Sequence, residues 1–330
     1  MTMLDTLRSR YVNLAQPRLG AEVVYATDDF FADKARLIDP ADPVFIPGKY
    51  DDNGKWMDGW ESRRKRIPGH DWCVIRLGVP GLVAGFEIDT AHFTGNYPPG
   101  AEIEVCNSGE AVPGDDAGWA RVTPRLALKG HDRIWVPIAH ADPVTHVRLH
   151  IFPDGGVARL RVWGRVVKDW SAVGDNTRLD LLAMEHGGRG IIANDEHYGA
   201  VENLTAPGRA LNMGDGWETR RRREPGHDWA ILELGTAGRI DEITVDTLHF
   251  KGNYPDRCFI QASPIASGTP EEIAAAAESW PVLLPETKLY PHMAETYSLV
   301  ADLGPVRFVR LNIIPDGGVS RLRLIGKVAR

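Results

Sequence analysis

Residues 58–72 read DGWESRRKRIPGHDW, and residues 215–229 read DGWETRRRREPGHDW. Twelve of these fifteen positions are identical, at a constant offset of 157 residues. The same offset relates DTAHFTGNYP (89–98) to DTLHFKGNYP (246–255), and an offset of 162 relates RLHIFPDGGVARLR (148–161) to RLNIIPDGGVSRLR (310–323). A repeat of about 150 residues is too long for a solenoid unit and has the size of a domain with its own core. The sequence therefore predicts two homologous domains in tandem.

The repeat also suggests where the parts of the chain begin and end. We expect an N-terminal segment over residues 1–19, a first repeat over 20–168, a linker over 169–186 and a second repeat over 187–330. Near the start of each copy, ATDDFFA (26–32) matches ANDEHYG (193–199) at an offset of 167. Since the offset then falls to 157, the first repeat carries about ten extra residues, around VFIPGKYDDNGKW (44–56).

Apolar and polar residues alternate over short stretches in both copies. Residues 101–107, 145–151 and 158–162 show this period of two, which is typical of half-buried strands. Residues 72–77 and 83–89 read as two more strands flanking a turn at GVPG. The pattern predicts an all-β protein with two antiparallel β-sandwich (jelly-roll) domains. One helix is predicted over 269–279, where Thr269 can cap the helix and Pro270 takes its first position.

The composition is that of an ordinary globular protein, with 43% hydrophobic and 25% charged residues and a net charge of −7. A mildly acidic chain argues against nucleic acid and anionic membranes as partners. No stretch is apolar enough to span a membrane, and the first twenty residues lack the apolar core of a signal peptide. Three dispersed cysteines do not form a disulfide framework. We therefore expect a cytoplasmic protein.

Charged and polar residues recur at matching positions in both copies, although many apolar positions differ. Arginines can bind a carboxylate through paired hydrogen bonds, Glu and His can transfer protons, and Asn can bind an amide-like group. The candidate catalytic residues are Glu61, His70, His92, Glu218, His227 and His249. The candidate substrate-binding residues are Arg63, Arg64, Arg66, Asn96, Tyr97, Arg220, Arg221, Arg223, Asn253 and Tyr254.

Each candidate has a structural alternative. The charged residues of the first block can form an ion-pair network, and His92 can be a core residue whose hydrogen bonds are satisfied. Asp154 reads most simply as a turn residue. Arg159 and Arg161 alternate with apolar residues and so face away from the core, where they line a site or are solvated. The copies also diverge at one polar position, where His150 faces Asn312.

Several catalytic motifs are absent from the sequence. It has no phosphate-binding loop, no dinucleotide fingerprint, no HExxH and no GxSxG. No thiol nucleophile is expected, because Cys73 aligns with Ala230. His70, His92 and Asp71 are alternative metal ligands but lack a compact ligand motif. We expect neither a metal nor an organic cofactor.

In combination, ATDDFFADKARLI (26–38) and the three doubled blocks resemble the allantoicase (allantoate amidinohydrolase) family over nearly the whole chain. The resemblance implies two tandem jelly rolls similar to galactose-binding or discoidin-like sandwiches. It also implies hydrolysis of allantoate to ureidoglycolate and urea in purine and ureide degradation, by a homo-oligomer.

For that substrate, we expect Arg63, Arg64 or Arg66 to bind the carboxylate, Glu61 and His70 to transfer protons, and Asn96 and Tyr97 to bind the ureido groups. The second copy holds either a second site or the opposite wall of a shared one. Direct displacement and loss of urea followed by hydration both fit the sequence. The alternative function is a non-catalytic module that binds carbohydrate or another small ligand.

Overall fold

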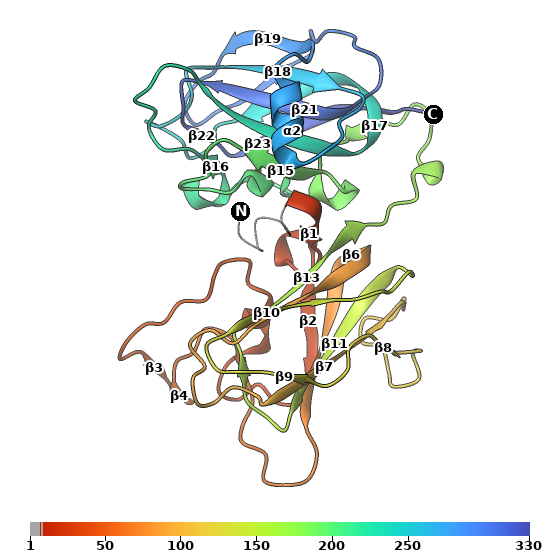
Figure 1. Ribbon diagram of the computed structural model, residues 1–330, viewed down its shortest axis with the longest axis vertical. Helices are drawn as coiled ribbons and strands as arrows, with labels where there is room; N and C mark the ends of the chain where they lie inside the picture. The colour runs from red at the N-terminus through yellow and green to blue at the C-terminus, as the bar shows by residue number, and fades with distance from the viewer. Residues whose placement is uncertain (1–6, 8) are drawn as a thin grey trace. The chain divides into compact units, whose positions relative to one another are not determined.

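The computed structural model describes residue 7 and residues 9–330. The chain forms two compact units, one over residues 11–167 and the other over residues 168–330 together with residues 7, 9 and 10. Each unit contains one repeat and is built from antiparallel strands (Figure 1). This confirms the prediction of an all-β protein with two tandem repeats.

The elements of the first repeat begin before residue 20. Its strands are β1 (Val12–Asn13), β2 (Glu22–Ala26), β3 (Tyr50–Asp51), β4 (Gly54–Lys55), β5 (Trp60–Glu61), β6 (Asp71–Asp89), β7 (Gly100–Cys106), β8 (Ala120–Arg121), β9 (Leu126–Ala127), β10 (Arg133–Pro137), β11 (Val144–Phe152), β12 (Gly156–Val157) and β13 (Arg159–Val166). Its short 3₁₀ helices are η1 (Pro17–Leu19) and η2 (Lys34–Ile38).

The second repeat follows the same order. Its strands are β14 (Leu179–Asp180), β15 (Arg189–Ala193), β16 (Trp217–Glu218), β17 (Asp228–Asp246), β18 (Arg257–Ser263), β19 (Val282–Lys288), β20 (Ala294–Tyr297), β21 (Val306–Ile314), β22 (Gly318–Val319) and β23 (Arg321–Val328). The 3₁₀ helices in this unit are η3 (Trp170–Ala172), η4 (Met184–His186), η5 (Val201–Thr205) and η6 (Met213–Asp215).

The 19-residue strand β6 takes part in both layers of the first sandwich. Its first part, up to Arg76, pairs with β2 and β11, and β11 in turn pairs with β7. Its last part, from Gly81, pairs with β13, and β10 also pairs with the end of the strand. The predicted turn at GVPG is wrong, because the chain stays extended there. A Cβ on Gly78 would lie 2.0 Å from the carbonyl oxygen of Leu19, so glycine permits a close backbone approach rather than a turn.

The inward side chains of both layers form one core in each repeat. In the first repeat, Ile75 and Leu149 of one layer and Phe86 and Leu160 of the other belong to the same buried cluster. The second repeat repeats this arrangement around β17, β21 and β23. This alternation of buried residues confirms the strands predicted from the period of two.

The outward face of the sheet is less exposed than the alternation suggests. Arg159 is 1% exposed and pairs with Asp58, and Arg161 is 3% exposed and pairs with Glu87. The alternative that these arginines are solvated is therefore wrong, since both are buried in ion pairs. Arg159 binds Asp58 and Arg161 also binds Asp42, so both hold the chain ahead of β5 against the sheet.

The predicted helix is present in the second repeat as α2 (Pro270–Ala277). Thr269 caps it, because its side chain accepts a hydrogen bond from the backbone N–H of Glu272, and the backbone N–H of Thr269 donates one to the Glu272 carboxylate. The buried face of α2 packs against β15 and β18 (Figure 1).

Candidate active site

The block DGWE brings Glu61 to the end of the first sandwich. Trp60 is fully buried, and its indole N–H donates to the backbone carbonyl of Asp28 at 2.8 Å. The two residues of β5 pair with β12, so that Glu61 lies opposite Gly156. The buried tryptophan thus fixes the backbone from which the Glu61 carboxylate projects.

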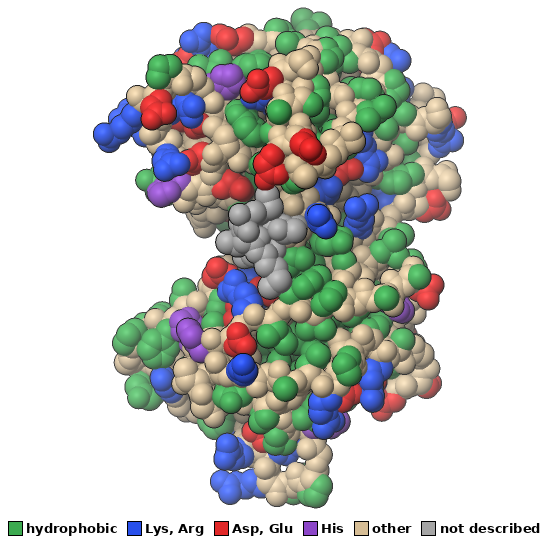
Figure 2. All heavy atoms as spheres, viewed as in Figure 1, with side chains coloured by type: hydrophobic (Ala, Val, Ile, Leu, Met, Phe, Trp, Pro, Cys, Tyr) green, Lys and Arg blue, Asp and Glu red, His purple; other side chains and the backbone are tan. Residues whose placement is uncertain are grey.

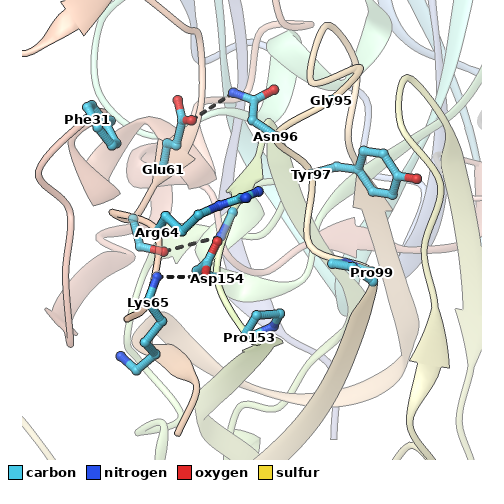
Figure 3. A pocket seen from close by; sticks show the side chains of 12 residues that line it. Phe31, Glu61, Arg64, Lys65, Gly95, Asn96, Tyr97, Pro99, Pro153 and Asp154 are labelled. Carbon is cyan, nitrogen blue, oxygen red and sulfur yellow. Dashed lines mark hydrogen bonds between the residues drawn. The ribbon is translucent and has the colours of Figure 1, made fainter. Parts of the chain in front are cut away.

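Residues from all three repeated blocks meet around this carboxylate (Figure 3). The Asn96 side-chain amide donates to Glu61 Oε1 at 2.7 Å, and the backbone carbonyl of Asn96 accepts from the backbone N–H of Gly156 at 2.7 Å. The backbone N–H of Lys65 donates to Asp154 Oδ2 at 2.8 Å. Together these loops enclose a cavity of about 600 Å³. Its lining residues are Phe31, Glu61, Ser62, Arg64, Lys65, Gly95, Asn96, Tyr97, Pro99, Pro153, Asp154 and Gly155.

Gly155 allows two of these loops to touch. Its φ is 138°, a conformation that side chains disfavour. A Cβ at this position would lie 2.7–2.8 Å from backbone atoms of Asn96, Tyr97 and Pro98. The repeated PDGG sequence is therefore more than a turn, since it packs directly under the loop that carries Asn96.

The surroundings of Glu61 raise the pKa of its carboxyl group. It is mostly buried, and burial raises the pKa of its carboxyl group, although the hydrogen bond from Asn96 acts in the opposite direction. Only Oε1 is bound within the described part of the chain, which leaves Oε2 for a ligand in the cavity. A carboxyl group with a raised pKa can hold a proton closer to neutral pH and release it to a leaving group.

The cationic residues of the block differ in their surroundings. Arg63 pairs with Asp28 at 2.6 Å, and Lys65 pairs with the buried carboxylate of Asp71 at 2.5 Å. Arg64 lines the cavity, and no described residue binds its guanidinium group. Figure 3 shows its side chain reaching into the middle of the residues that line the cavity. Arg66 does not line the cavity. Of the three predicted arginines, Arg64 is thus the one available for a carboxylate.

His70 lies outside the residues that line the cavity. Its Nε2 is 2.9 Å from His150 Nδ1, and His150 Nε2 is 3.0 Å from Glu104 Oε2. Its ring also packs on Phe152, with the centroids 4.3 Å apart. Burial is the main cause that lowers the pKa of His70, and the neighbouring His150 lowers it further. Burial likewise lowers the pKa of His150, against the opposing effect of Glu104. His70, His150 and Glu104 form a row of hydrogen-bonded side chains, and the lowered pKa values of the two histidines favour their neutral forms.

His92 lines a smaller cavity of about 340 Å³ beside the first one. Its Nε2 is 3.1 Å from the carbonyl oxygen of Pro43, and its backbone N–H donates to His131 Nδ1 at 2.9 Å. The φ of His92 is 68°, in the left-handed region. One ring nitrogen of His92 is therefore hydrogen-bonded to the backbone. This agrees in part with the alternative interpretation of His92 as a core residue whose hydrogen bonds are satisfied.

The second repeat keeps the framework of this site. Asn253 donates to the Glu218 carboxylate, burial raises the pKa of Glu218, and the backbone N–H of Arg222 donates to Asp316 at 2.9 Å. Arg220 pairs with Asp195, which matches the pairing of Arg63.

The surroundings of that framework differ from those in the first repeat. The cavity described there, of about 440 Å³, is lined by Arg220, Arg221, Arg222, Arg223, Asn194, Asp195, Glu224 and Asp228. Glu218, Asn253 and Tyr254 do not line it. His227 binds Asn312 in place of a second imidazole, and His249 binds the carbonyl oxygen of Ala210.

Comparison with known proteins identifies the family. A family model described as the allantoicase repeat matches residues 12–167 and residues 179–329. The chain belongs to the allantoicase family. It is 53% identical over 318 residues to a protein named probable allantoicase 1 from Burkholderia mallei, covering 96% of this chain and 94% of that one. A probable allantoicase from Stutzerimonas stutzeri is 53% identical over 322 residues, covering 97% of each chain.

A solved allantoicase has the same fold. The crystal structure of allantoicase from Saccharomyces cerevisiae is 34% identical, covers 99% of this chain and 98% of the yeast chain, and gives a TM-score of 0.83. These findings confirm the allantoicase resemblance and the tandem β-sandwich fold that the repeated motifs indicated.

Two polar residues with side chains at the candidate site, Lys65 and Asp154, were missing from the sequence-based candidates. Lys65 was not considered as a candidate, and Asp154 was assigned to a turn. Both line the cavity. The signal that could have found Asp154 is its recurrence as Asp316, which accepts the same backbone hydrogen bond in the second copy.

Metal ligands and reactive thiols are two other features on which catalysis can depend. Within residues 7 and 9–330, no three His, Cys, Asp or Glu side chains are grouped so that they could hold a metal ion. The cysteines are free and buried, and burial raises the pKa of Cys106 to about 11 and of Cys258 to about 12. These thiols are poor nucleophiles, because the thiolate is the reactive form. None of the described helices is long and apolar enough to cross a membrane.

Proposed function

We propose that this protein hydrolyses allantoate to ureidoglycolate and urea, and that the cavity lined by Glu61 and Arg64 is its active site. The observation that carries the proposal is the pairing, across one cavity, of a carboxyl group with a raised pKa and an arginine that no described residue binds. Allantoate requires both, since it carries a carboxylate and releases a ureido nitrogen that must gain a proton. Membership in the allantoicase family supports the same reaction.

In the proposed reaction, Arg64 binds the carboxylate through its planar guanidinium group. Glu61 gives its proton from Oε2 to the nitrogen that leaves, while the bond from that nitrogen to the central carbon breaks. Urea is then released, and the hydroxyl group of water takes its place on the carbon to give ureidoglycolate. The remaining proton of the water returns to the Glu61 carboxylate and restores the acid. Asn96 holds Glu61 in place through Oε1, and Tyr97 lines the cavity on the side of Asn96. This role for Glu61 is the same for direct displacement and for elimination followed by hydration.

A colorimetric assay of urea release from allantoate tests the proposal. Glu61→Gln should lower kcat by roughly 10²–10⁴, the usual effect of removing one general acid. The matched control is Glu218→Gln, since Glu218 makes the same contact with Asn253 in the second repeat.

We expect Glu218→Gln to leave more than half of the activity, with unchanged thermal melts for both variants. If each variant loses about half, both repeats catalyse and the assignment to the first repeat is wrong. No urea release by the unaltered protein would remove the proposed function altogether.

The family finding does not favour the alternative function, a binding module without chemistry. We further propose that the protein works in the cytoplasm as a homo-oligomer. Three unpaired cysteines suit a reducing compartment, and the oligomer rests on the family resemblance alone. Light scattering of the purified protein tests the oligomer, and a single-chain mass would count against it.

A further inference from the structure

The second repeat contains four consecutive arginines at residues 220–223, where the first repeat has RRKR at residues 63–66. This run lies between β16 and β17. All four arginines line the cavity of about 440 Å³ in the second repeat. Figure 2 shows Lys and Arg side chains beside Asp and Glu side chains at the edge of the second repeat where Figure 1 labels β16 and β22. The cavity therefore concentrates positive charge in a chain whose net charge is −7.

The first and third arginines of the run are held by carboxylates. Arg220 donates from its backbone N–H and from Nε to the two carboxylate oxygens of Asp195, at 3.0 and 2.7 Å. Arg222 donates from its backbone N–H to Asp316 Oδ2 at 2.9 Å and from Nη1 to Asp228 Oδ1 at 2.9 Å. These contacts fix the backbone of the run and leave the arginines in between to the cavity.

The second and fourth arginines have unbound guanidinium groups. Arg221 and Arg223 are exposed, and no described residue binds either side chain. Arg222 adds one more donor, because its Nε is buried and has no hydrogen-bond partner among the described residues. A buried donor without an acceptor is unfavourable, so a ligand that supplies acceptors would stabilise this arrangement.

The carboxylates that line the cavity cancel only part of its positive charge. Asp195 and Asp228 are already paired with Arg220 and Arg222, respectively. Glu224 is exposed, and no described residue binds its carboxylate. Two unbound guanidinium groups therefore share the cavity with one unbound carboxylate, and this excess of positive charge favours an anion.

The cavity lacks the groups that the first repeat offers for catalysis. Glu218, the counterpart of Glu61, does not line it, and Asn253 does not line it either. The cavity is therefore suited to bind an anion without the proton transfer proposed for Glu61.

The donors of the cavity match a phosphate group better than a single carboxylate. Arginine binds phosphate through paired N–H groups that lie in one plane. A phosphate group on a larger molecule carries about two negative charges near pH 7 and three acceptor oxygens. It can therefore bind Arg221 and Arg223 together, whereas a monoanion such as allantoate can neutralise only one of them.

We propose that this cavity of the second repeat is a binding site for a phosphate group, separate from the active site. The phosphate group belongs to free phosphate or to a nucleotide, since both present the same oxygens. The proposal goes beyond the proposed function and does not depend on it, because no residue of the cavity takes part in the proposed reaction.

Titration calorimetry of the full-length protein with inorganic phosphate, at constant ionic strength, tests the proposal. Arg221→Gln and Arg223→Gln each remove one unbound guanidinium group, and both side chains are exposed, so the fold should be preserved. The matched controls are Arg64→Gln and Arg66→Gln, the same positions in the first repeat. We expect phosphate binding to weaken at least tenfold in the second-repeat variants and less than twofold in the controls.

Glu224→Gln tests the same site by a gain of binding, which a misfolded variant cannot produce. It removes the unbound carboxylate, so phosphate should bind at least twofold more tightly. Adenosine monophosphate, titrated in the same way, distinguishes the two sources of the phosphate group. Tighter binding than that of inorganic phosphate indicates a nucleotide, and equal or weaker binding indicates free phosphate.

Several results would overturn the proposal. They are the absence of saturable phosphate binding, equal weakening in the variants and their controls, and unchanged binding in Glu224→Gln. Displacement of phosphate by allantoate, measured in the Glu61→Gln protein, would also overturn it, because the cavity would then be a second substrate site. If the unaltered protein releases no urea but binds phosphate in the expected pattern, the proposed function fails and this inference stands.

Discussion

Replacing Gly155 by alanine should separate the stability of the first repeat from its activity. Gly155 has a φ of 138°, and its twin Gly317 has a φ of 134°. A side chain in such a conformation costs about 1–3 kcal/mol. The new Cβ would also lie 2.7–2.8 Å from backbone atoms of Asn96, Tyr97 and Pro98, so the loop that carries Asn96 must move. In the second repeat the corresponding distances are 2.6–2.9 Å, so Gly317→Ala is a closely matched control.

The two effects can be estimated separately. For a domain of this size, 1 kcal/mol shifts the melting temperature by about 2–4 °C, so a cost of about 1–3 kcal/mol corresponds to roughly 2–12 °C. Differential scanning calorimetry should show a loss in that range for both alanine variants. Misplacing a catalytic group by about 1 Å costs on the order of 10²-fold in rate. We expect Gly155→Ala to lower kcat/KM for allantoate at least tenfold, because it shifts the partner of Glu61, and Gly317→Ala to leave it within twofold.

Three results would contradict this reasoning. If Gly155→Ala melts and turns over like the unaltered protein, the contact between the PDGG loop and the Asn96 loop does not hold the site together. If Gly317→Ala loses as much activity as Gly155→Ala, the second repeat also contributes to catalysis. A drop in melting temperature without loss of activity would make the loop contact purely structural.

Two further predictions concern Arg64 and the histidine row. Arg64→Lys should raise KM for allantoate roughly tenfold with a smaller effect on kcat, because the point charge of lysine replaces the planar guanidinium group. Steady-state kinetics measure both constants, with Arg221→Lys as the control. Equal effects of the two substitutions would show that Arg64 has no special role. The pKa values of His70 and His150 lie below the usual value for histidine, which is about 6.5. Between that value and the lower pKa of the folded state, the folded protein binds fewer protons than the unfolded chain. The folded protein therefore loses stability as the pH falls through this range. His150→Asn, which copies Asn312, should therefore reduce the fall in melting temperature between pH 7 and pH 5, and parallel curves for the two proteins would contradict this.

The sequence predicted the fold well because two copies had to satisfy the same physical constraints. Alternation identified the strands, and recurrence of Glu61 and Asn96 as Glu218 and Asn253 identified residues that the structure brings into contact. The contact between Glu61 and Asn96 could not be predicted, because the sequence does not show how residues 35 positions apart meet in the fold. The strand across GVPG was also missed, because a glycine needed for close packing has the same sequence signature as a glycine in a turn.

The position of His70 shows a second limit of sequence reasoning. Asp71 contacts Lys65 beside the cavity, whereas the adjacent His70 contacts His150 and Phe152. Neighbouring residues at a strand end project in different directions, so closeness in sequence to a site residue does not place a side chain in the site. A similar limit applied to Arg159, since alternation predicts the face of a sheet but not the segments that cover it.

Strand β6 has a consequence for how each repeat comes apart. Because the continuous backbone of β6 contributes hydrogen bonds to both layers, detaching one layer also breaks strand pairing in the other. Partial opening should therefore spread along the strand, and amide protons near Cys73 and Phe86 should exchange with solvent in one cooperative event. The same property makes residues 71–89 a poor place to divide the chain into complementing fragments, whereas the inserted hairpin around Tyr50 is a more suitable place for a cut.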